Sequence, residues 1–64
     1  MDDFNQFIGQ NYYVITDKIQ SVAAERGWST SLIENNLDYN IDLDNTRVKV
    51  YTDADSVIQK FVRG

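Results

Sequence analysis

The chain has 64 residues and a formal net charge of −4, with 10 acidic and 6 basic side chains. It contains no cysteine and no histidine, which excludes a disulfide and the usual ligands of a zinc site. The acidic balance and the scattered basic residues argue against binding to nucleic acid or to an anionic membrane. We therefore expect one domain, residues 1–64, stabilised by packing alone and acting without a cofactor or a metal.

The N-terminal segment has no basic and apolar regions of a secretory leader, and no stretch of the chain is long and apolar enough for a membrane span. We expect a soluble chain and leave its compartment open. Phe4, Phe7 and Ile8 form a short apolar patch that ends at Gly9, where a turn is expected. This segment is predicted to be an arm that docks on the rest of the domain.

A helix is predicted from about Asn11 or Tyr12 to Arg26. Asn11 is a suitable N-cap, and Gly27 stands where a left-handed residue commonly ends a helix. The apolar residues of this stretch recur at the spacing of one helix face; they are Tyr12, Ile15, Ile19, Val22 and Ala23. A later start at Thr16 is the alternative, because threonine is also a good cap.

Three strands are predicted after the helix, over residues 28–33, 47–51 and 57–62, where β-branched and aromatic residues are frequent. The last two flank the polar, turn-forming residues 52–56, so they should pair as neighbours. Val48 and Val50 alternate with Arg47 and Lys49, and the simplest interpretation places the valines in the core and the basic residues in water. Trp28 and Tyr51 are expected to serve packing.

The connection between the first two strands, residues 34–46, is the candidate site. It is about 13 residues long, whereas connections in compact domains usually have about 4 to 6, and longer ones often carry function. It is polar, but an apolar residue occupies every second position from Leu37 to Leu43. Such alternation is typical of an extended backbone, which is the conformation that a protease cleft accepts from a substrate.

The stretch Asn40-Ile41-Asp42-Leu43-Asp44-Asn45-Thr46-Arg47-Val48-Lys49-Val50-Tyr51 resembles, without a gap, the reactive loop and following strand of the potato inhibitor I family of serine-protease inhibitors. The order of helix, strand, loop and two strands is also similar. The resemblance implies an α+β fold with one α-helix packed on a small mixed β-sheet and a long exposed reactive loop. It further implies a monomeric, reversible, substrate-like inhibitor of subtilisin-, elastase- or chymotrypsin-like proteases, and not an enzyme.

By this resemblance Asn40, Ile41 and Asp42 occupy the P2, P1 and P1′ positions, and the scissile bond is Ile41-Asp42. Arg47 and Lys49 would brace the loop by donating hydrogen bonds to Asp42. The aliphatic P1 residue fits an elastase-like or subtilisin-like enzyme better than a trypsin-like one. A second alignment, which needs an insertion of four residues, places P1 at Leu37.

The loop has two other interpretations. The carboxylates of Asp38, Asp42 and Asp44 could form a solvated surface, in a noninhibitory protein-interaction domain with the same fold. Asp38, Asn40, Asp42 and Asp44 also resemble alternating calcium ligands, but the glycine and the final glutamate of a calcium-binding loop are missing, so we expect no metal. Catalysis is not expected either, because the chain has no histidine or cysteine.

Overall fold

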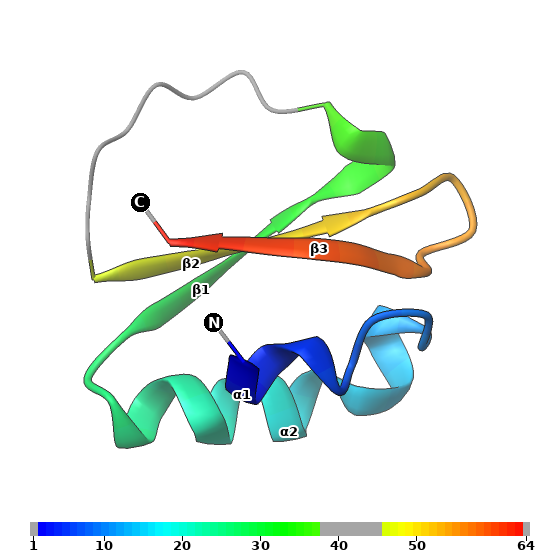
Figure 1. Cartoon of the computed structure of the whole chain (residues 1–64). Helices are drawn as coiled ribbons and strands as arrows, with labels where there is room; N and C mark the ends of the chain where they lie inside the picture. The colour runs from blue at the N-terminus through cyan, green and yellow to red at the C-terminus, as the bar shows by residue number, and fades with distance from the viewer. Residues whose placement is uncertain (1, 38–45, 64) are drawn as a thin grey trace.

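The computed structural model describes residues 2–37 and 46–63 of the chain. The elements in chain order are helix α1 (Asp2–Asn5), helix α2 (Tyr12–Glu25), strand β1 (Ser29–Ile33), the 3-10 helix η1 (Glu34–Asn36), strand β2 (Arg47–Thr52) and strand β3 (Ile58–Arg63). The fold is α+β, with α2 packed on a small mixed sheet as predicted. Both α-helices lie against the same face of this sheet (Figure 1). Among the described residues, no helix is long and apolar enough to cross a membrane.

The sheet has three strands in the order β1-β2-β3, so β2 is central. β1 and β2 are parallel, with Ser29 opposite Arg47 and Ile33 opposite Tyr51. β2 and β3 are antiparallel, and their register shifts between Tyr51 and Thr52. Since side chains alternate along a strand, Val48, Val50 and Thr52 face the helices, while Arg47, Lys49 and Tyr51 lie on the other face, which we call the outer face.

Helix α2 begins at Tyr12, as predicted, and ends at Glu25, one residue before the predicted end. The side chain of Asn11 accepts a hydrogen bond of 2.9 Å from the backbone N–H of Tyr13, which satisfies one of the donors left free in a first turn. At the other end Arg26 is the C-cap, and Gly27 has a left-handed φ of 72°. The alternative start at Thr16 is therefore wrong.

The N-terminal arm is itself partly helical, which its short apolar patch did not predict. Helix α1 places Phe4 in the core, where it is 1% exposed, and Phe7 is also buried. Ile8, expected in the same patch, is instead 44% exposed. The ring of Phe4 lies 5.2 Å from that of Phe61 and 6.3 Å from that of Trp28, and Asp3 forms an ion pair with Arg26. The arm thus contacts β3 and the end of α2.

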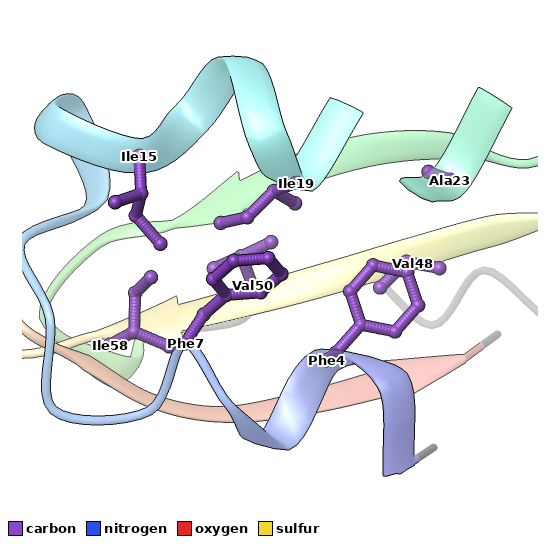
Figure 2. Packing of buried hydrophobic residues seen from close by; sticks show 8 residues of the cluster. All are labelled: Phe4, Phe7, Ile15, Ile19, Ala23, Val48, Val50 and Ile58. Carbon is purple, nitrogen blue, oxygen red and sulfur yellow. The ribbon is translucent and has the colours of Figure 1, made fainter. Parts of the chain in front are cut away.

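The core lies between the helices and the inner face of the sheet. Figure 2 shows the side chains of α2 pointing toward those of β2 and β3, with the two phenylalanines closing the core from the N-terminal segment. Its buried members are Phe4, Phe7, Ile15, Ile19, Ala23, Val48, Val50 and Ile58. Burial of a large side chain of this kind contributes roughly 1.5 to 3 kcal/mol. Trp28 packs at the edge of this cluster, as expected.

The predicted strands differ from the observed ones only near their ends. Trp28 precedes β1, and Thr52, predicted to begin the turn, is the last residue of β2. Val57 forms an isolated bridge with Asn11, so β3 begins at Ile58. In the turn, the carboxylate of Asp53 accepts hydrogen bonds from the backbone N–H groups of Asp55 and Val57. This side-chain cap holds β2 and β3 together as a hairpin.

Candidate functional site

The predicted site connects two neighbouring parallel strands, and this topology determines where its ends lie. The chain leaves the carboxyl end of β1 and enters the amino end of β2. In a parallel pair these two points lie at opposite ends of the strands. A strand of five residues, such as β1, is about 15 Å long. The two attachments of the connection are therefore separated by about the length of the sheet.

The first attachment is η1, a hydrogen-bonded turn directly after β1. The backbone N–H of Leu37 donates to the carbonyl of Glu34 over 3.0 Å, and Asn35 adopts a left-handed conformation with φ 53°. The buried hydroxyl of Thr52 donates to the carbonyl of Ile33 over 3.2 Å. A longer contact of 3.5 Å runs from the hydroxyl of Tyr13 to the carboxylate of Glu34. The turn is thus tied to β2 and to α2.

The second attachment is the start of β2. The backbone N–H of Ser29 donates to the carbonyl of Thr46 over 2.8 Å, and Arg47 then pairs with Ser29 in the parallel ladder. Backbone hydrogen bonds hold this end of the connection at Arg47, the first residue of β2. The pairing of β1 with β2 therefore fixes the point at which the connection joins the sheet.

The outer face of the sheet is basic. The register places the side chains of Arg47 and Lys49 from β2 and Lys60 from β3 on that face. The Lys60 ammonium lies 4.6 Å from the centre of the Tyr51 ring, in a cation–π contact. Half of the six basic residues of an acidic chain therefore lie on one face of the sheet.

Lys49 does not face water, which corrects the simplest interpretation of the alternating strand. Only 6% of its surface is exposed, and Arg47 is half-buried. Burial of an ammonium group is costly unless it is paired or hydrogen-bonded. Both residues take part in interactions. The outer face is thus a place where a carboxylate would be stabilised by two adjacent cations.

The predicted P2, P1 and P1′ residues, Asn40, Ile41 and Asp42, lie outside the described residues, as do Asp38 and Asp44. Bracing of the loop by Arg47 and Lys49 accordingly stays a prediction. The structure does bring these two basic side chains together on the outer face, and it places Leu37 at the other end of the connection, 54% exposed.

The residues that hold the start of the connection are not among those that the sequence singles out. Thr52 stands among the polar residues of the predicted turn, although its position two residues after Val50 continues the alternation of the strand. The contact between Tyr13 and Glu34 joins residues 21 apart in the chain, and no sequence pattern indicated it.

Two further features bear on what the described part of the chain binds. Within residues 2–37 and 46–63, no three or more histidine, cysteine, aspartate or glutamate side chains are grouped so that they could hold a metal ion. A hollow of about 220 Å³ lies at the junction of α2 and β1, lined by Gln20, Trp28, Ser29 and Thr30.

No family of proteins, curated protein or solved structure matches the chain in comparisons with known proteins.

Proposed function

We propose that this protein is a reversible, substrate-like inhibitor of serine proteases and not an enzyme, and that it acts through the connection between β1 and β2. The observation that carries the proposal is the pair of hydrogen-bonded attachments at the two ends of this connection. Ile33 and Glu34 hold one end through hydrogen bonds from Thr52 and Tyr13, and the ladder bond from Ser29 holds the other. Binding a segment whose ends are already held costs less conformational entropy than binding a free peptide.

The basic outer face supports the proposed bracing. A substrate-like inhibitor must keep its cleaved ends in place so that the bond re-forms, which requires a loop tethered to the domain. Arg47 and Lys49 would donate charge-assisted hydrogen bonds to the carboxylate of Asp42, and such bonds are about twice as strong as neutral ones. The burial of Lys49 agrees with this role, because a buried ammonium is stable beside a carboxylate.

The geometry of η1 favours Ile41 over Leu37 as the P1 residue. A protease binds the residues on both sides of the scissile bond in an extended conformation. The two positions before Leu37 belong to a 3-10 turn, and Asn35 is left-handed with φ 53° and ψ 30°. A protease could not bind these residues as a strand without unfolding the turn, so we assign the scissile bond to Ile41-Asp42.

The proposal is tested by titrating subtilisin, elastase, chymotrypsin and trypsin with the protein, followed by mass spectrometry of each mixture. We expect stoichiometric loss of activity of a subtilisin-like or elastase-like enzyme, with the chain intact or cut only between Ile41 and Asp42. Full activity of all four enzymes would overturn the proposal and favour the noninhibitory interaction domain, in which the acidity of the loop matters instead.

A matched pair of variants then tests the P1 assignment. Ile41→Ala should weaken inhibition by at least about tenfold, because the P1 side chain fills the main specificity pocket of the enzyme. Leu37→Ala removes a similar exposed aliphatic side chain from the same connection and should leave inhibition unchanged. The reverse ranking would show that Leu37 is the P1 residue.

A further inference from the structure

Two guanidinium groups meet at the ring of Trp28, the single tryptophan of the chain. The guanidinium carbon of Arg63, the last residue of β3, lies 5.1 Å from the centre of this ring. That of Arg26, the C-cap of α2, lies 5.5 Å from the same centre. Both distances are those of cation–π contacts, so the ring holds two cations from different elements side by side.

Within the described part of the chain, only one of these two cations is neutralised. Arg26 forms an ion pair with Asp3 of helix α1. Arg63 is exposed, and none of residues 2–37 and 46–63 provides a carboxylate partner for its side chain. Like charges held at one ring repel each other, and an anion beside Arg63 would remove this repulsion.

Arg63 and Trp28 also keep side-chain donors that the described fold does not use. Stacking occupies the flat face of a guanidinium and leaves the N–H groups at its edge able to donate. Neither these groups nor the indole N–H of Trp28 donates a hydrogen bond to any described residue. No buried side-chain nitrogen among the described residues lacks a partner, so the indole N–H is accessible from outside.

We propose that Arg63 and Trp28 bind a carboxylate group, supplied by a small molecule or by an acidic side chain of another protein. The two oxygen atoms of a carboxylate match the paired N–H groups of a guanidinium. Asp3 beside Arg26 shows that a carboxylate fits next to this ring. A single negative charge is favoured over a phosphate dianion, because Asp3 and Glu25 lie at the same end of α2 and repel further charge.

This site is separate from the connection between β1 and β2, and the inference does not depend on protease inhibition. Trp28 precedes β1, whereas the connection follows it. A few exposed hydrogen bonds compete with water and give weak binding, so the dissociation constant for a single carboxylate should be on the order of 10 mM.

The indole N–H of the only tryptophan gives one signal in a proton–nitrogen NMR spectrum, and this signal tests the proposal directly. Sodium acetate at neutral pH should shift it saturably, whereas sodium chloride at the same ionic strength should not. Arg63→Gln should raise the dissociation constant about tenfold or more, because the charged fork is lost. Lys18→Gln removes one exposed positive charge from α2 and is the matched control, which should bind acetate as the unmodified protein does.

Two capped tripeptides distinguish the sources of the carboxylate. Acetyl-Ala-Glu-Ala-amide should bind more tightly than acetate if the ligand is an acidic side chain of a protein, and equally if it is a small molecule. Acetyl-Ala-Gln-Ala-amide should not shift the signal. Arg63→Lys retains the charge without the fork and keeps the test decisive if Arg63→Gln fails to fold. Equal responses to acetate and chloride would overturn the proposal, and so would equal binding of acetate by the foldable Arg63 variant and the unmodified protein.

Discussion

Lys49 lies near the middle of the central strand, on the outer face of the sheet, with 6% of its surface exposed. Lysine is rarely buried to this degree unless its charge is paired, because desolvation of an ammonium group is costly. An alternating strand pattern identified the residue as polar and outward-facing, but it gave no information on what covers the outer face. Alternation assigns a side chain to one face of a sheet, but the extent of burial on that face is a tertiary property that alternation does not encode.

Replacement of Lys49 tests the bracing at the level of one residue. Lys49→Met keeps the length of the side chain and removes the charge, so the domain should remain folded while the connection loses a tether. We expect cleavage at Ile41-Asp42 by a responsive protease to accelerate on the order of tenfold, which corresponds to about 1.4 kcal/mol. Cleavage is followed by mass spectrometry, and a thermal melt verifies the fold.

Lys60→Met is the matched control for this experiment. Lys60 lies on the same outer face but is exposed, and it contacts the ring of Tyr51. Its replacement should leave the rate of cleavage unchanged. If both variants are cut equally fast, the effect is one of general surface charge, and the specific bracing role of Lys49 is wrong.

At the level of elements, α2 depends on its N-cap. The side chain of Asn11 accepts the hydrogen bond from the backbone N–H of Tyr13, and its amide group donates to the carbonyl of Asp55 over 3.5 Å. Asn11→Ala should lower the free energy of unfolding by about 1 kcal/mol, as measured by urea denaturation, because the side-chain acceptor is lost. Asn11→Asp retains the acceptor for Tyr13 but loses the donor to Asp55, so it should recover only part of this loss. Equal losses in both variants would show that the cap contributes little.

Elements with a regular period were predictable, and elements fixed by tertiary contacts were not. Helix α2 and the strands β2 and β3 follow from spacing, capping and turn residues, and only their ends shifted. Helix α1 has four residues, too few to show a helical period, and its position depends on packing of Phe4 against Phe61 at the other end of the chain. For the candidate site, the sequence indicates the connection and the basic residues next to it. It does not indicate the hydrogen bonds that Thr52 and Tyr13 donate to the start of the connection.

The whole molecule should unfold in one step, because all its elements share one core. Trp28 is the single tryptophan, and its ring stacks on Phe4 and lies near the guanidinium groups of Arg26 and Arg63 at 5.5 and 5.1 Å. Its fluorescence therefore reports on the junction of α1, α2 and β3, whereas far-ultraviolet circular dichroism reports mainly on α2. The two urea transitions should coincide. An earlier fluorescence transition would mean that α1 undocks before the rest unfolds.

The contact between Phe4 and Phe61 joins the first element of the chain to the last. Val48, Val50 and Ile58, which face the helices across the core, also belong to the final third of the chain. A ribosome adds these residues after the helical half of the domain, so the emerging N-terminal half has no sheet on which to pack. The domain therefore completes its fold only after β3 has left the ribosome, and until then Phe4, Ile15 and Ile19 are exposed to chaperones and to neighbouring nascent chains.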